Sequence, residues 1–92
     1  MIKSFKNNNL KRFFLKGQAH KIDTTLHDRV ELLLDQLDAS TTAQDMDTPG
    51  NDFHKLGGFK PVRYSVHANG NWCITFEWDG DDAVKVDLED YH

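Results

Sequence analysis

Two short segments of the chain carry side chains suited to proton transfer. His54 lies in the segment FHKLGG, and the sequence ends Asp90-Tyr91-His92. An imidazole titrates near neutral pH and can both take and give a proton, and a nearby carboxylate can act as a base or orient the ring. The alternative is that His54 decorates an exposed loop and that the terminal residues are frayed. We expect the terminal group to be ordered, because the preceding apolar alternation runs to Leu88.

Metal and thiol chemistry have little support in the sequence. The histidines stand at positions 20, 27, 54, 67 and 92, and no two of them have the spacing of zinc ligands. Cys73, the single cysteine, has no base at a defined spacing that would activate it as a nucleophile. We therefore expect no metal site, no cofactor and a small, partly buried thiol.

Two N-terminal helices are expected to support these groups. After Asn7-Asn8-Asn9, which offers a cap, Leu10, Phe13 and Phe14 fall on one helical face, and Gly17 fits the helix stop. A second helix begins after Asp23 or Thr24. Its apolar residues form one stripe: Leu26, Val30, Leu33, Leu34 and Leu37.

An antiparallel sheet is expected to provide the remaining framework. Met1–Phe5 alternates and predicts a first strand, whereas residues 40–58 form a long connection with a turn at 49–51 and at most a brief helix near 42–46. After Pro61, turns at Asn69-Gly70 and Asp79-Gly80 separate three strands. The fold class is therefore α+β, with both helices on one face of the sheet.

The period of two sorts the side chains of these strands between the two faces of the sheet. The residues expected toward the core are Trp72, Ile74, Phe76 and Trp78, with Val84, Val86 and Leu88 on one face of the last strand. The residues expected on the opposite, outward face are Asn71, Cys73, Thr75 and Glu77.

Length and charge limit the class of protein. With 92 residues, 38% of them hydrophobic, the chain is expected to form one domain over residues 1–92. Its net charge of −4 is uneven: residues 1–22 hold six basic side chains and no acid, and residues 77–90 hold seven acids and one lysine. The absence of a signal-peptide core or a membrane-length apolar run, together with the single cysteine, predicts a cytoplasmic protein that does not enter membranes.

Four segments in order resemble one protein family. They are the opening MIKSFK, the loop PGNDFHKLGG, the hairpin RYSVHANGNWCITFEW and the ending LEDYH. Together they resemble HigB-type toxins of bacterial type II toxin–antitoxin systems, within the RelE superfamily. The resemblance covers the whole chain and implies a compact RelE-like fold, an antiparallel sheet with two N-terminal helices packed on it.

The resemblance also implies an activity and partners. The implied activity is that of a ribosome-dependent endoribonuclease, an mRNA interferase that inhibits translation. The implied partners are a HigA-like helix-turn-helix antitoxin, the ribosome with bound mRNA, and operator DNA only indirectly through the antitoxin. The positions that match the family's functional residues are His54, Asn71, Asp90, Tyr91 and His92.

The chain departs from the family pattern at three basic positions. Cys73 stands where the family has the arginine of NWRI, Gly57 where it has the lysine of LKG, and Asp52 where relatives have the arginine of PGNR. The nearby groups expected to contact RNA phosphate instead are Lys55, Lys60, Arg63 and His67. These losses keep a second hypothesis open, a catalytically weakened interaction module that binds antitoxin or ribosome without efficient cleavage. A gyrase inhibitor is a third hypothesis, which the DYH ending disfavours.

Overall fold

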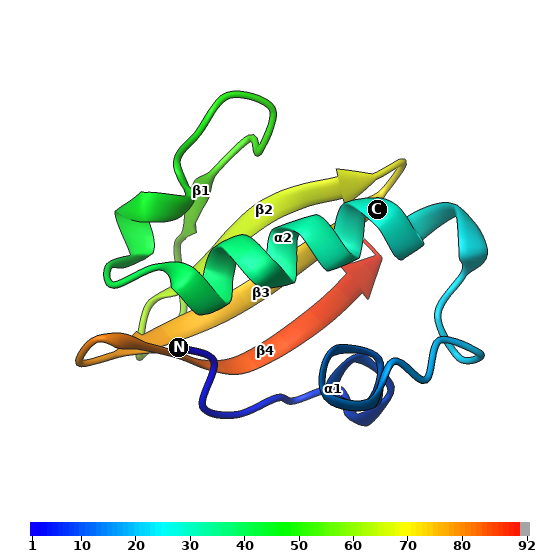
Figure 1. Cartoon of the computed structure of the whole chain (residues 1–92). Helices are drawn as coiled ribbons and strands as arrows, with labels where there is room; N and C mark the ends of the chain where they lie inside the picture. Colours follow the sequence, from blue (N-terminus) through cyan, green and yellow to red (C-terminus); the bar gives the residue numbers. More distant parts are fainter. Residues whose placement is uncertain (91–92) are drawn as a thin grey trace.

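The computed structural model describes residues 1–90 and has a four-stranded antiparallel sheet with the longer of its two α-helices across one face and the shorter one beside the last strand (Figure 1). The α+β class is thus confirmed. The strands follow one another in the order β1-β2-β3-β4. The elements are α1 (Asn8–Lys16), η1 (Thr24–Leu26), α2 (His27–Ala39), η2 (Ala43–Met46), β1 (His54–Leu56), β2 (Arg63–Asn69), β3 (Trp72–Asp79) and β4 (Asp82–Asp90). No helix within residues 1–90 is long and apolar enough to cross a membrane.

Local chemistry sets both ends of α1 and the start of η1. Asn7 caps α1, because its side-chain oxygen accepts hydrogen bonds from the backbone N–H groups of Asn9 and Leu10 at 2.9 and 3.0 Å. Gly17 ends α1 in the left-handed conformation at φ 66°. Asp23 caps η1 by accepting from Thr25 N–H, and η1 runs directly into α2.

The core lies between α2 and the sheet. The apolar stripe of α2 is buried as predicted, and Ile74 and Phe76 of β3 are fully buried against it. Trp72 and Trp78, at the two ends of β3, pack on the edge of this core and are only partly buried. The predicted inward face of β3 is therefore confirmed.

Met1–Phe5 does not form the strand predicted from its alternation. It makes two isolated parallel bridges to β4, Ile2 with Ala83 and Phe5 with Val86. Between these bridges, the N–H of Lys85 donates to Ser4 Oγ at 2.8 Å instead of to a backbone carbonyl. The parallel ladder is broken there, so the segment never becomes a continuous strand.

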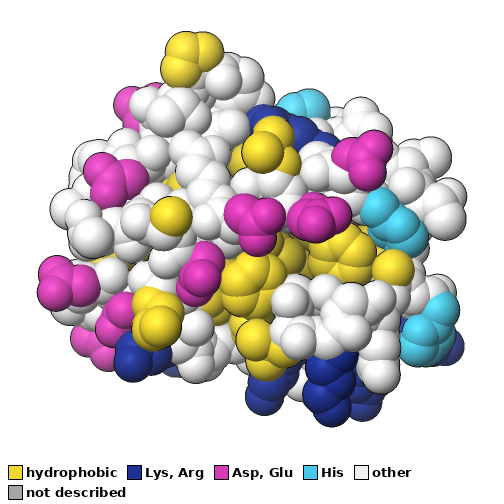
Figure 2. Space-filling model, viewed as in Figure 1, with side chains coloured by type: hydrophobic (Ala, Val, Ile, Leu, Met, Phe, Trp, Pro, Cys, Tyr) yellow, Lys and Arg dark blue, Asp and Glu magenta, His cyan; other side chains and the backbone are white. Residues whose placement is uncertain are grey.

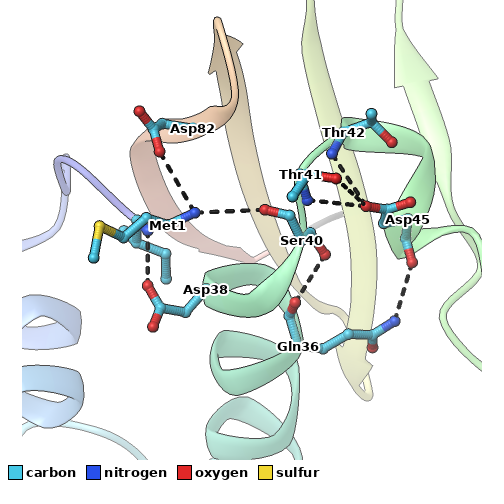
Figure 3. Close-up of polar contacts among 9 residues, drawn as sticks. Met1, Gln36, Asp38, Ser40, Thr41, Thr42, Asp45 and Asp82 are labelled. Atoms are coloured by element: carbon cyan, nitrogen blue, oxygen red, sulfur yellow. Dashed lines mark hydrogen bonds and ion pairs between the residues drawn. The ribbon is translucent and has the colours of Figure 1, made fainter.

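Side chains and the terminal amine fasten this segment instead (Figure 3). The Met1 amino group lies 3.5 Å from Asp82 Oδ1 and 3.4 Å from Ser40 O, and Ile2 N–H donates to Asp38 Oδ1 at 2.8 Å. These contacts tie the start of the chain to the end of α2 and to the start of β4.

The first strand of the sheet is β1, in a segment predicted to be a loop. His54, Lys55 and Leu56 pair with Ser65, Tyr64 and Arg63 of β2. Three residues are too few to show a period of two, which explains why the pattern missed this edge strand. The two hairpin turns also lie one residue later than predicted, at residues 70–71 and 80–81.

A bulge in β4 corrects the predicted face of Val84. Thr75 pairs with Asp87 and Glu77 with Val84, so β4 holds one extra residue there, and Lys85 takes a positive φ of 52°. Paired residues share a face, so Val84 lies on the Glu77 face, while Ala83 and Val86 enter the core.

The face opposite the helices is polar, as expected, but it is not open along its centre. Cys73, Thr75 and Glu77 are all buried. Arg63, from the neighbouring β2, is buried with them and lies against Thr75 and Glu77. Room for a site on this face therefore remains only toward its ends.

The cap of α1 gives a test of the fold. We expect Asn7→Ala to lower the free energy of unfolding by about 1 kcal/mol, because two backbone donors of the first helical turn lose their acceptor. Asn8→Ala, one residue into the exposed helix, is the matched control and should change stability by less than about 0.5 kcal/mol. Urea unfolding measures both, and equal losses would contradict the assigned cap.

Candidate active site

A pocket opens on the polar face of the sheet, at the end where β2 turns into β3. Its volume is about 230 Å³. The residues that line it come from the loop before β1, from β1, β2, β3 and the intervening turn: Asp52, His54, Ser65, His67, Gly70, Asn71 and Cys73. The pocket therefore brings together three predicted site residues, His54, Asn71 and His67.

His54 is held by a carboxylate that the sequence did not single out as a site residue. Its Nε2 lies 3.1 Å from Oδ1 of Asp52, and both side chains are exposed. Asp52 has a positive φ of 48°, which turns the chain back just before β1. In the tautomer in which Nε2–H donates to Asp52, Nδ1 is free to accept a proton. The sequence signal that could have identified Asp52 is its position two residues before His54, within reach of the imidazole.

The loop that carries Asp52 is fastened to α2 and β2 by Arg29 and Asn51. The Arg29 guanidinium donates to Gly50 O at 2.8 Å, to Asn51 Oδ1 at 2.9 Å and to His67 O at 3.3 Å. Asn51 is buried, and its side-chain amide donates to Met46 O at 2.9 Å. Its backbone carbonyl accepts from the backbone N–H of His67 at 2.7 Å. The sequence analysis did not identify Arg29 or Asn51. Neither lines the pocket, but both hold the loop that forms one of its walls.

His67 and Asn71 form the wall on the turn side. His67 pairs with Cys73 across the β2–β3 ladder, and its Nε2 lies 2.9 Å from Gly70 O. Asn71 lies in the turn, not on the strand where the alternation placed it. Its exposed position at the end of the polar face still puts it in the pocket.

Cys73 is poorly suited to nucleophilic chemistry. Burial raises the pKa of its thiol, and the carboxylates of Asp52 and Glu89 raise it further. A raised pKa keeps the sulfur protonated at neutral pH, and the thiolate is the reactive form. The pocket therefore relies on imidazole and carboxylate groups.

The predicted phosphate-contacting cations do not gather here. Arg63 is 5% exposed and donates to Glu77 Oε2 and Thr75 Oγ1, both at 2.9 Å, and to Lys85 O at 3.1 Å. Lys55 is exposed on β1 opposite Tyr64, and Lys60 is exposed in the loop before Pro61. None of the three lines the pocket among the described residues.

Asp90 lies around the turn from this pocket. It ends β4 opposite Trp72 and lines a second hollow of about 410 Å³, on the side of η1. Asn71 lines both hollows and so stands between Asp90 and the His54 pocket. The other two predicted residues, Tyr91 and His92, lie outside the described residues.

The described pocket can transfer protons and donate hydrogen bonds. His54 and His67 provide imidazoles, Asp52 a carboxylate and Asn71 a neutral amide. Within residues 1–90, no three histidine, cysteine or carboxylate side chains are placed to hold a metal ion. No lysine or arginine is among the described lining residues, so a bound phosphate would meet imidazole and amide donors.

Comparison with known proteins identifies the chain's relatives. Residues 3–92 match the family model described as the RelE-like toxin of the type II toxin–antitoxin system HigB. The chain is 34% identical over its full 92 residues to the Endoribonuclease HigB of Proteus vulgaris, all of which is covered. It is also 26% identical over 87 residues to an uncharacterized protein of Haemophilus influenzae, covering 92% of this chain and 86% of that one.

The buried position of Arg63 gives a test that separates support of the fold from contact with phosphate. We expect Arg63→Met to lower the free energy of unfolding by about 3–5 kcal/mol, because the buried Glu77 carboxylate loses its partner. The double variant Arg63→Met/Glu77→Leu should recover most of that loss, because it removes both charges. Urea unfolding measures both variants. A double variant as unstable as the single one would contradict the assigned role of the pair.

Proposed function

This chain belongs to the family of RelE-like HigB toxins of type II toxin–antitoxin systems, and we propose that it is an endoribonuclease that cuts mRNA on the ribosome. The observation that carries the proposal is the pocket in which Asp52, His54, His67 and Asn71 meet. The Proteus vulgaris relative is named an endoribonuclease and aligns from end to end. Cleavage on ribosomes would take place in the cytoplasm.

The chemistry that fits this pocket is attack of a ribose 2′-oxygen on the adjacent phosphorus. A base takes the 2′-hydroxyl proton, the phosphorus–O5′ bond breaks, and an acid supplies a proton to the leaving 5′-oxygen. We propose that His54, oriented by Asp52, transfers one of these protons. Asn71 would donate a hydrogen bond to the phosphate oxygens, whose charge is concentrated in the transition state. His67 would donate one through Nδ1 in its imidazolium form, because its Nε2–H is directed at Gly70 O.

The end of β4 completes the proposed site. Asp90 lies beside Asn71 around the turn, in the neighbouring hollow. The family resemblance assigns functional positions to Asp90, Tyr91 and His92, and we propose that they supply the second proton-transfer group and a surface for stacking or hydrogen bonding with the RNA. Lys55, exposed on β1, and Lys60, exposed in the loop that follows it, would contact phosphates farther along the RNA.

As a type II toxin, the chain has an antitoxin as its partner. We propose that this antitoxin is HigA-like, with a helix-turn-helix domain, and that operator DNA is reached only through it. The other proposed partner is the ribosome with bound mRNA.

One observation favours a second function. The pocket has no described lysine or arginine, and Arg63 is occupied by Glu77. Losing a single donor to a transition-state oxyanion costs on the order of 10²–10³ in rate. The alternative is therefore an interaction module that binds antitoxin or ribosome without efficient cleavage.

Replacing His54 tests the proposed activity. With programmed ribosomes and a defined message, His54→Ala should lower the cleavage rate by about 10²–10⁴-fold, because a positioned proton-transfer group is lost. New 5′ ends mapped on the message measure the rate. His20→Ala, at an exposed position between α1 and η1, is the matched control and should cleave like the parent chain. Equal rates for all three chains would exclude His54 from catalysis, and no new 5′ ends with any of them would favour the interaction module.

Cys73 tests whether the missing cation limits the rate. We expect Cys73→Arg to speed cleavage, by up to about 10²-fold, because a guanidinium in this pocket can contact phosphate through two hydrogen bonds. Cys73→Gln, which adds length without charge, should leave the rate near that of the parent chain. The same ribosome assay measures both, with thermal unfolding as the folding control. If the arginine variant folds but cleaves no faster than the glutamine variant, the missing cation does not limit the rate.

A further inference from the structure

A groove separates α1 from α2 on the face of the molecule away from the pocket. Its volume is about 430 Å³. The residues that line it come from α1, from the turn after it, and from α2: Phe13, Phe14, Gly17, Ala19, His27, Asp28, Glu31 and Asp35. Figure 2 shows hydrophobic side chains exposed between the two helices, with acidic side chains along one side of them.

The floor of the groove is aromatic and only half-buried. Phe13 packs against His27 with ring centroids 5.5 Å apart, and Phe14 packs against Phe5 at 5.9 Å. Both phenylalanines contact the core with one side and line the groove as well. Leu32, which follows Glu31 on α2, is 57% exposed but is not among the residues that line the groove.

One wall of the groove is a row of carboxylates. Asp28, Glu31 and Asp35 are exposed and are spaced three and four residues apart, so they lie on one side of α2. No ion pair among the described residues involves any of them. Like charges at this spacing destabilise a helix slightly, so the row does not help α2 to fold. The nearest arginine of the helix, Arg29, is bound to the loop at Gly50 and Asn51.

An aromatic floor beside free carboxylates suits a basic protein segment. The aliphatic stem of a lysine or arginine can lie on the rings while its cation meets the carboxylates. The same carboxylates would repel the phosphates of RNA, so this wall of the groove does not fit a nucleic acid. We propose that the groove receives a helical segment of the antitoxin that presents apolar side chains and a row of Lys or Arg residues. This inference rests on the proposed function for the identity of the partner.

Charge reversal in the groove tests the proposal. The probe is the purified antitoxin encoded beside this chain, titrated calorimetrically at two salt concentrations. Glu31→Lys/Asp35→Lys should weaken binding by about tenfold or more and remove most of its salt dependence, because attraction becomes repulsion. Glu31→Gln/Asp35→Asn, which only removes charge, should weaken binding by less. Asp47→Lys/Asp81→Lys, an equal charge change at exposed positions outside the groove, is the matched control and should bind like the parent chain.

Each other outcome has a defined meaning. If the groove variants bind the antitoxin as tightly as the control, or if the parent chain does not bind it, the proposal is overturned. If the parent chain self-associates and charge reversal dissociates it with unchanged antitoxin affinity, the occupant is a second copy and the proposal is also overturned. Ribosome assays without antitoxin should show equal cleavage by parent, groove and control chains. Should none of them cleave while the groove variants still lose antitoxin affinity, the nuclease proposal fails and the groove assignment is supported.

Discussion

The bulge at Lys85 is the constraint on which the two faces of the sheet depend. One extra residue in β4 reverses the alternation, so that Ala83 and Val86 both face the core although three positions separate them. The buried Arg63 holds this irregularity by donating to Lys85 O at 3.1 Å, while it also binds Thr75 and Glu77 of β3. A single guanidinium thus joins three strands. Without it, the buried carboxylate and the bulge carbonyl would both lose a donor.

The same constraint governs the start of the chain and the centre of the polar face. Lys85 N–H donates to Ser4, so the N-terminal segment follows β4 by isolated bridges only. Thr75, which accepts from Arg63, donates in turn to Glu89, one residue before Asp90. The polar network therefore fills the middle of the face and leaves the pocket at one end, between the β2–β3 turn and the loop held by Asn51.

Elements that depend on a regular repeat or on a local capping residue could be predicted from the sequence. The stripe of α2, the cap at Asn7 and the alternation from Trp72 to Trp78 each depend on local geometry that the residue types express directly. The bulge could not be predicted, because Val84 and Ala83 are both apolar and either register buries one of them. The three residues of β1 are too short to show a period.

The candidate site was predictable to a similar degree. Residue type and resemblance point to His54, His67 and Asn71, and the fold brings them to one pocket. In the sequence, Asp52 marks only the loss of an arginine, although its carboxylate orients His54. Arg63 is basic and near these residues in sequence, which predicts a contact with phosphate. Its burial depends on Glu77, 14 residues away, which no local pattern reveals.

Lysine and arginine are absent from the described lining of the pocket, but this absence does not by itself argue against cleavage. Two effects contribute to the rate, stabilisation of charge in the transition state and positioning of the reacting atoms, and they differ in size. A missing donor to the transition state costs on the order of 10²–10³ in rate. Holding the attacking and leaving atoms in line can contribute effective molarities of about 10⁵–10⁸ M. If the ribosome holds the message, the larger of these effects does not depend on the chain's own cations. The pocket then needs only to place His54 against the RNA backbone. Asp52 holds His54 directly, and Asn51 and Arg29 hold the loop that carries Asp52.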